Sequence, residues 1–483
     1  MPRELSILQV STADVLGGAE AIARNLHVAY RRLGHDSHMA VGRKRSDDPD
    51  VHRITHHKGE ATSLRRRIAW GLHAAMQPHF HKIPGARLMA PVLQSLAEPS
   101  GWLGRRRGIE DFNFPGSLQL LDLPPRTPKV VHCHNLHANY FDLRALPGLS
   151  RRVLVILTLH DAWLLAGHCA HSFDCDRWRT GCGQCPDLSI YPAVRRDATA
   201  ENWRRKAEVF AQCRVCVTAP CDWLLQRAKQ SMLAPAIADA RVIPNGVDTS
   251  IFHPGDMQAA RRALGLPMDA AILLFVAQSP GQNPFKDFAT IRRAIGQLAT
   301  QPLERPLLFL ALGGSGRPER INGAEIRYIP AQADAMTVAD YYRAADLYLH
   351  SARADTFPNT ILEALACGRP VVATAVGGIP EQIISLVPCG SATTGEAIDD
   401  ATGVLVAAGD ADGLAHFSAT ILGNRQLAIR LAGSAAKDAS SRFSLDRQVE
   451  AFLALYRELL DPPPSRRPSS PMPRAELIPA HTR

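Results

Sequence analysis

The sequence predicts an α/β protein built from two doubly wound parallel sheets. Short apolar runs alternate with helical patterns in two series, one over residues 1–250 and one over residues 265–440. A turn-rich stretch at about 249–268 separates the two series. The length of 483 residues suits two or three domains, and a hydrophobic content of 46% is enough for two buried cores.

The first series opens with a short apolar strand at residues 5–11. Gly17 and Gly18 follow it and precede a helical pattern in which apolar residues recur every three or four positions. Later apolar runs predict buried strands at residues 130–133, 153–159 and 215–218. Strands that alternate with helices predict a parallel sheet covered on both faces.

A basic segment at about 58–115 interrupts this alternation. Apolar stripes at four-residue spacing predict two amphipathic helices in it, near residues 64–76 and 88–96. The formal charge of the chain is +9, and it is concentrated in this segment and in the tail from residue 461. Ordinary packing on the sheet is the first interpretation, and peripheral contact with an anionic membrane surface is the alternative. A local patch does not suggest a nucleic-acid binder.

The second series predicts strands at residues 272–277, 307–312, 326–329, 347–350, 371–374 and 404–406. A last amphipathic helix is predicted at 442–460, within a C-terminal helical unit at 441–460. The Pro-, Ser- and Arg-rich tail at 461–483 is predicted to be disordered. No apolar run approaches the roughly 18 residues of a membrane-spanning helix, and the N-terminus does not resemble a signal peptide. We therefore expect a cytoplasmic protein, with the inner face of the membrane as a further location.

The most informative stretch runs from the predicted strand at 347–350 to Glu363. Asp355 follows the strand, and a helix is predicted at 360–367 with Pro358 in its first turn. The free N–H groups and the dipole of a helix start form a site for an anion such as a diphosphate. Carboxylates accept hydrogen bonds from sugar hydroxyls, so Asp355 and Glu363 suit the two sugars of a nucleotide sugar. A capping acid and a surface Glu are the alternative.

These residues carry a family resemblance. The stretch Asp355-Thr-Phe-Pro-Asn-Thr-Ile-Leu-Glu363, together with Gly377-Gly-Ile-Pro-Glu381, resembles the signature of the family 4 retaining glycosyltransferases. The resemblance implies the GT-B fold, in which two Rossmann-like domains face a central cleft. Within the family, the chain resembles the branch that assembles bacterial exopolysaccharides such as colanic acid, through Thr158-Leu-His-Asp-Ala-Trp163, Gly167-His-Cys-Ala-His-Ser-Phe-Asp-Cys175 and Asn283-Pro-Phe-Lys-Asp-Phe288.

The resemblance also implies roles for single residues. Glu363 would bind the nucleotide ribose, and Asp355 would contact the donor-sugar hydroxyls in place of the usual Glu. Lys286 would bind the donor phosphates, without the Arg that the family places a few residues earlier. His160 would face the reacting sugar. We predict catalytic roles for these four residues and donor contacts from Gly17, Gly18, Lys286, Asp355, Phe357, Asn359, Thr360 and Glu363.

Several of these residues also have simpler interpretations. Lys286 could be a surface lysine, His160 a buried histidine, Asp161 a cap of the next turn, and Gly17 and Gly18 a plain turn. Their joint occurrence at matching strand ends favours the site.

A cysteine cluster is the second distinctive feature. Cys169, Cys175, Cys182 and Cys185 lie close together in sequence, and the last two have the Cys-x-x-Cys spacing of a zinc knuckle. A structural zinc is one interpretation, and reduced packing cysteines or a redox pair are the others.

The predicted function is transfer of a sugar from a nucleoside diphosphate sugar to a saccharide or lipid-linked saccharide, with retention and without a catalytic cofactor. A sugar-nucleotide epimerase of the same architecture and a non-catalytic partner subunit are the alternatives. A nicotinamide-dependent dehydrogenase is disfavoured, because the loop after the first strand lacks the three-glycine fingerprint.

Overall fold

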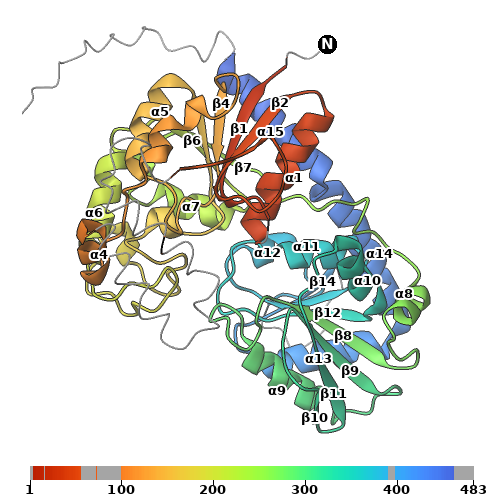
Figure 1. Ribbon diagram of the computed structural model, residues 1–483. Coiled ribbons are helices and arrows are strands. Elements are labelled where there is room, and N and C mark those ends of the chain that lie inside the picture. The colour runs from red at the N-terminus through yellow and green to blue at the C-terminus, as the bar shows by residue number, and fades with distance from the viewer. Residues whose placement is uncertain (1–3, 16, 56–71, 73–98, 390–397, 462–483) are drawn as a thin grey trace, which may run out of the picture.

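The computed structural model describes residues 4–15, 17–55, 72, 99–389 and 398–461. They form two seven-stranded sheets, each flanked by helices, one above the other in Figure 1. The first sheet is built before residue 243 and the second after residue 270. This is the two-sheet α/β architecture that the sequence predicts.

The first sheet has the strand order β3-β2-β1-β4-β5-β6-β7, and all of its pairs are parallel. Its strands are β1 (Ser6–Ala13), β2 (Asp36–Arg43), β3 (Val51–Arg53), β4 (Val130–Cys133), β5 (Leu154–Thr158), β6 (Val215–Ala219) and β7 (Ile237–Val242). Its α-helices are α1 (Gly18–Arg32), α4 (Pro99–Arg106), α5 (Leu146–Arg152), α6 (Thr199–Phe210) and α7 (Asp222–Lys229). Short 3-10 helices are η2 (Pro115–Asp122), η3 (Leu143–Ala145), η4 (Trp163–Leu165), η5 (Arg177–Arg179) and η6 (Ala234–Ala236).

The second sheet has the order β10-β11-β9-β8-β12-β13-β14, with only the edge strand β10 antiparallel to its neighbour. Its strands are β8 (Ala271–Val276), β9 (Leu307–Leu312), β10 (Glu319–Ile321), β11 (Ala324–Ile329), β12 (Leu347–His350), β13 (Val371–Thr374) and β14 (Gly403–Val406). The helices of this half are α8 (Met257–Ala263), α9 (Phe288–Leu298), α10 (Ala335–Ala344), α11 (Asn359–Ala366), α12 (Ile379–Gln382), α13 (Ala411–Gly423), α14 (Arg425–Arg442) and α15 (Leu445–Leu460).

Both sheets reverse their strand order once, between β1 and β4 in the first and between β8 and β12 in the second. In open parallel sheets, ligands bind outside the carboxyl ends of the strands at this point. The start of α1, which follows β1, lies beside α11 and α12, which follow β12 and β13 (Figure 1). The two binding edges therefore face each other.

The last helix differs from its prediction at 442–460. Arg442 ends α14, and a new helix, α15, begins at Leu445, where the Ser444 hydroxyl accepts a hydrogen bond from the Arg447 N–H at 3.4 Å. This helix returns to the first sheet, where Phe452 and Tyr456 are fully buried against residues of β1 and α1. The C-terminal helix thus completes the core of the N-terminal half.

Other elements were missed by the sequence pattern. The first sheet gains β2, β3 and β7, whose polar and glycine residues hide the apolar alternation, and the predicted linker at 249–268 contains α8. The amphipathic stripes predicted near 64–76 and 88–96, and the tail from residue 462, lie outside the described residues apart from Leu72. Within the described residues, no helix is long and apolar enough to cross a membrane.

Candidate active site

A cleft of about 380 Å³ lies between the two facing binding edges. From the first half it is lined by the start of α1 and by the loop after β5. From the second half it is lined by the loop after β8 and by the segment that joins β12 to α11. The predicted residues in its lining are Gly18, His160, Lys286, Asp355, Phe357, Asn359 and Thr360.

The N-terminus of α11 points into this cleft without a side-chain cap. Pro358 occupies the capping position, and no side chain accepts a hydrogen bond from the first turn. The Asn359 amide donates to the Gly18 carbonyl at 3.3 Å and accepts from the Asn245 amide at 3.0 Å. The helix start is thereby fixed against the glycine loop of the other half, and its backbone N–H groups remain available to an anion.

A glycine pair supports the segment that carries Asp355. Gly377 has a φ of +57°, and a Cβ atom there would lie 1.8 Å from the Asp355 carbonyl oxygen. The Gly378 N–H donates to the Thr356 carbonyl at 3.0 Å, and a Cβ atom on Gly378 would lie 2.2 Å from that oxygen. Only glycine allows the two backbones to approach this closely.

Lys286 is not a surface lysine. It lies just before α9, its side chain is 13% exposed, and its ammonium is paired with the Asp355 carboxylate. His350, at the end of β12 and fully buried, lies 3.1 Å from Lys286 Nζ and 3.5 Å from Asp355 Oδ2. The loops after β8 and β12 therefore meet in one charged group of three side chains.

The electrostatics of this group favour a charged Lys286–Asp355 pair beside a neutral histidine. Burial opposes ionisation of Asp355, but the adjacent ammonium outweighs burial and holds the carboxyl pKa well below its ordinary value. Burial and the same ammonium lower the pKa of His350 to about 4. The mouth of the second sheet, meaning the loops at the carboxyl ends of its strands, thus carries the charged Lys286–Asp355 pair.

Glu363 lies one turn into α11, four residues after Asn359 and hence on the same side of the helix. It is half-buried and is not among the residues that line the cleft. The Tyr342 hydroxyl donates to its carboxylate at 2.8 Å, and burial raises its pKa to about 7. Its ionisation is therefore poised near neutrality.

The carboxyl edge of the first sheet carries two stacked histidines next to the Asp161–His137 pair. His160 Nε2 lies 2.9 Å from His134 Nδ1, the two rings stack, and His134 Nε2 lies 2.8 Å from Gln9 Oε1. Burial lowers the pKa of His160 to about 4, and it also lowers that of His134. His160 is thus a neutral imidazole, held in place by its neighbour.

The glycine loop is shaped by Gly17, which has a φ of +111° and precedes α1. A Cβ atom at Gly17 would lie 2.1 Å from the Glu20 carboxylate, so a side chain there would displace that carboxylate as well as strain the backbone. Gly18 begins α1 and receives the hydrogen bond from Asn359. The two glycines form a turn that meets the second half, beyond their role as a plain strand–helix connection.

Phe357 fits its prediction only in part, because its ring is 5% exposed and packs edge-on against Phe443. Asp161 does cap the following turn, accepting from the Trp163 N–H at 2.9 Å, but it also pairs with His137 at 2.7 Å. The polar residues at or near the cleft that were not predicted for the site include His350, His171 and Asn245. The sequence did offer one sign of His350, because this histidine ends the predicted apolar strand at 347–350.

Two of these residues present buried polar atoms to the cleft. His171 Nε2 and Asn245 Oδ1 have no hydrogen-bond partner among the described residues. The His171 ring stacks on Trp223, and burial lowers its pKa to about 4. A buried polar atom without a partner is costly, so these atoms offer hydrogen bonds to water or to a polar ligand in the cleft.

The four clustered cysteines line one small cavity with His168, and all four are free thiols. The Gly167 N–H donates to Cys182 Sγ at 3.3 Å, and His168 Nε2 lies 3.3 Å from Cys185 Sγ. However, no group of three or more His, Cys, Asp or Glu residues in the described part of the chain is placed to hold a metal ion. The predicted structural zinc finds no support, and burial keeps thiols such as Cys182 protonated by raising the pKa to about 11.

Comparison with known families agrees with this geometry. Residues 16–251 match the family model for Glycosyltransferase Family 4, and residues 270–424 match the model for Glycosyl transferases group 1. The D-inositol 3-phosphate glycosyltransferase of Actinosynnema mirum is 35% identical over 239 residues, which cover 46% of this chain and 53% of the relative. The corresponding protein of Acidothermus cellulolyticus is 34% identical over 234 residues, covering 46% and 48%. The chain spans about half the length of the curated relatives it matches.

Solved structures show the fold. HepE of Anabaena in complex with UDP superposes with a TM-score of 0.56 at 15% identity, covering 94% of this chain and 100% of HepE. Sucrose-phosphate synthase of Thermosynechococcus elongatus gives a TM-score of 0.56 at 18% identity, covering 94% and 99%. The chain has the GT-B fold, and both of its halves are related to glycosyltransferases, which supports assignment to family 4.

Proposed function

We propose that this chain, a glycosyltransferase with the GT-B fold, moves a sugar from a nucleoside diphosphate sugar to a hydroxyl of a saccharide acceptor, with retention of configuration. The observation that carries the proposal is the cleft itself. An uncapped helix start, a half-buried ammonium and the glycine loop of the other half converge there on one space.

The donor diphosphate would lie at the N-terminus of α11. The helix dipole and the free backbone N–H groups attract anions, and Lys286 supplies a full positive charge beside them. As the sugar leaves, negative charge develops on the diphosphate, and these preformed groups stabilise it. HepE, a structure with the same fold, has been solved with UDP and with UDP-glucose, which supports this class of donor.

Each of the two acids of the predicted signature would bind one sugar of the donor, either the ribose or the transferred sugar. Glu363, poised to ionise, would accept hydrogen bonds from the ribose hydroxyls. Asp355 would accept from the hydroxyls of the transferred sugar while Lys286 turns partly toward the phosphates. Their present ion pair holds the Asp355 carboxylate in its charged form before the donor arrives.

The first half would face the reacting sugar. Neutral His160 offers a hydrogen bond to a sugar hydroxyl without adding charge near the reacting carbon. The carboxylates that line the described cleft, Asp161 and Asp355, are each paired, with His137 and Lys286. This supports a reaction without a dedicated protein nucleophile, with closure of the cleft excluding water. Retention is proposed from the family resemblance.

The acceptor is proposed to be a saccharide or lipid-linked saccharide of the bacterial exopolysaccharide type. The relatives named for D-inositol 3-phosphate suggest a second candidate acceptor, a phosphorylated cyclitol. Both candidates are hydroxyl acceptors and use the same donor chemistry, so a transfer assay with each acceptor separates them.

The test starts from a thermal-shift screen of nucleotide sugars, since a bound donor at 100 times its Kd stabilises the fold by about 2.7 kcal/mol. The best donor is then incubated with saccharide acceptors and with D-inositol 3-phosphate, and proton NMR reads the anomeric configuration of the product. The proposal expects transfer with retention. Conversion of the nucleotide sugar without any acceptor would indicate an epimerase, and donor binding without turnover would indicate a non-catalytic subunit.

A further inference from the structure

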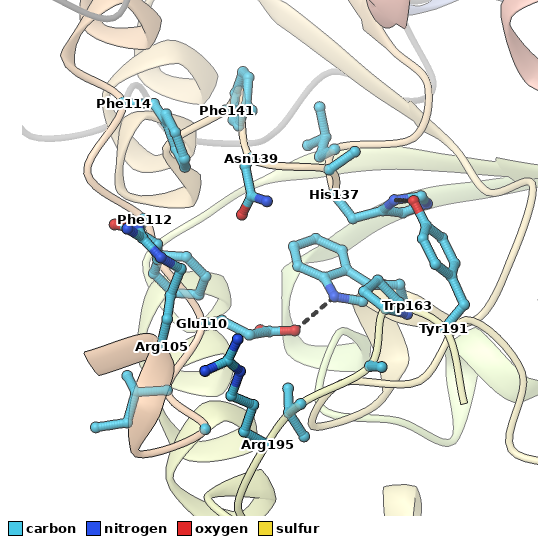
Figure 2. Close-up of a pocket in the computed structure, with 18 of the residues that line it drawn as sticks. Arg105, Glu110, Phe112, Phe114, His137, Asn139, Phe141, Trp163, Tyr191 and Arg195 are labelled. Atoms are coloured by element: carbon cyan, nitrogen blue, oxygen red, sulfur yellow. Dashed lines mark hydrogen bonds and ion pairs between the residues drawn. The ribbon is translucent and has the colours of Figure 1, made fainter. Parts of the chain in front are cut away.

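A second cavity, of about 520 Å³, lies in the first half and is drawn in Figure 2. Its walls come from α4 and the segment after it, from the loop after β4, from η4, and from residues 191–195. Its volume is in the range of small-molecule sites. The donor site described above does not use it.

The two cavities share a wall. His137 lines this second cavity and Asp161 lines the donor cleft, and their side chains meet at 2.7 Å. Tyr191 lines the second cavity, and its carbonyl accepts the N–H of Ala170, which lines the donor cleft, at 2.7 Å. One layer of residues therefore separates the donor from whatever occupies this cavity.

The cavity has the surface of a sugar site. Phe112, Phe114 and Phe141 lie on one side, and Tyr191 lies beside His137 on the other (Figure 2). Tyr191 is 47% exposed, which leaves its ring free to pack against a sugar. Trp163 is held in place, because its Nε1 donates to Glu110 at 2.6 Å and Lys206 Nζ lies 3.7 Å from its ring centroid.

Part of the wall has an unusual backbone. Ala138 and Asn139 both lie in the left-handed region, with φ values of 73° and 60°, and both line the cavity. Adjacent residues other than glycine rarely adopt this conformation, and such strain concentrates at binding sites.

The charge of the cavity is positive. Its two acids are compensated, Glu110 by buried Lys206 at 2.9 Å and Asp111 by Arg105 at 2.6 Å. The remaining lining arginines are Arg43, Arg106 and Arg195, and none of them has an ion-pair partner among the described residues, although Arg106 stacks on Trp102. Guanidinium groups of this kind match carboxylates and phosphates.

We propose that this cavity is the acceptor site and that the acceptor saccharide carries an acidic group, a carboxylate or a phosphate, held by Arg43 and Arg195. The assignment of this cavity to the acceptor rests on the proposed function. The aromatic rings would pack against the sugar rings, and the His137–Asp161 pair would move aside to let one acceptor hydroxyl reach the donor cleft.

The test uses three probes that differ only at carbon 6 of one sugar: glucose, glucuronic acid and glucose 6-phosphate. Titrations followed by NMR compare the wild-type chain with Arg43→Ala/Arg195→Ala, which removes two exposed arginines of the cavity. The control, Arg32→Ala/Arg320→Ala, removes two exposed arginines that line neither cavity. A third variant, Lys286→Met, weakens the donor cleft and leaves this cavity intact.

We expect at least one acidic probe to bind about tenfold more tightly than glucose, because charge-assisted contacts to arginine are strong. Preference for glucuronic acid identifies a carboxylate, and preference for glucose 6-phosphate identifies a phosphate. The preference should vanish in the cavity variant and persist in the control and in Lys286→Met. Equal binding of all three probes, or a preference that survives in the cavity variant or disappears in Lys286→Met, overturns the proposal.

The result is separable from the proposed function. The thermal-shift screen of nucleotide sugars decides whether the cleft binds a donor. The arginine-dependent preference for acidic sugars decides the chemistry of the second cavity, and it is measured without a donor.

Discussion

The two sheets of this protein end in mouths of opposite character. The mouth of the second sheet holds a charged pair, Lys286 and Asp355, and an uncapped helix start. The mouth of the first sheet holds glycines and the stacked neutral imidazoles of His134 and His160. The difference teaches that one strand order serves two chemistries. The anionic part of the donor meets an ammonium and a helix start, and the reacting sugar meets the neutral imidazole of His160 beside the Asp161–His137 pair.

The largest expected effect is on the charged pair. Lys286→Met leaves Asp355 half-buried with only His350 beside it, so the free energy of unfolding should fall by about 3 kcal/mol and donor affinity by about 100-fold. Chemical denaturation and calorimetric titration measure the two quantities.

Two controls separate the causes. Lys286→Met/Asp355→Asn removes both charges and should regain most of the stability without regaining donor affinity. Lys129→Met changes an exposed lysine and should alter neither. If the double variant binds the donor as well as the wild type does, Lys286 is not the phosphate ligand.

The next effect is a pH dependence of Glu363. Its pKa of about 7 lies above the ordinary carboxyl value, so only the form present above pH 7 accepts two ribose hydrogen bonds. Donor affinity should rise about tenfold between pH 6 and pH 8, and Glu363→Gln should flatten that rise. An identical pH dependence in the variant would remove Glu363 from the ribose site.

The same carboxyl group has an opposite effect on stability. A raised pKa means that the folded state binds the proton more tightly than the unfolded state does. Its contribution to stability is therefore complete below about pH 4.5 and is lost as the pH rises through about 7. The difference in unfolding free energy between the wild type and Glu363→Gln should shift across this window.

A smaller effect concerns the glycine loop of the first mouth. Gly17→Ala and Gly34→Ala both place a side chain at positive φ, at +111° and +81°, on either end of α1. Each should lose about 1 kcal/mol of stability. Only Gly17→Ala also displaces the Glu20 side chain, next to Gly18 and Ala19 of the cleft lining, so only this variant should lose turnover, by about tenfold. Equal turnover in the two variants would make the loop a plain turn.

The sequence predicted the architecture because the predicted strands contain short apolar runs, which are uninterrupted in β8 and β9. It missed β2, in which buried serine, histidine and glycine residues break the apolar run. It also joined Arg442 to the last helix, because the amphipathic pattern runs on through Phe443 while the Ser444 cap restarts the helix.

The candidate site was predictable where one segment carries both the strand end and the helix start, as in Asp355 to Asn359. His350 and Asn245 were missed, because their roles depend on contacts with Lys286 and Asn359, which are distant in the sequence. The second cavity was missed for the same reason, since Arg43 and Arg195 are distant in the sequence and line one cavity only in the folded chain.

The different roles of the two sheets are tested most directly by calorimetric titration with a nucleoside diphosphate. The nucleoside diphosphate is the one contained in the nucleotide sugar that the thermal-shift screen selects. Lys286→Met/Asp355→Asn should lose its binding by about 100-fold. His160→Gln should bind the diphosphate within about threefold of the wild type, because neutral His160 makes no charged contact, yet it should lose turnover. Loss of diphosphate binding in His160→Gln with retention in the double variant would contradict the account.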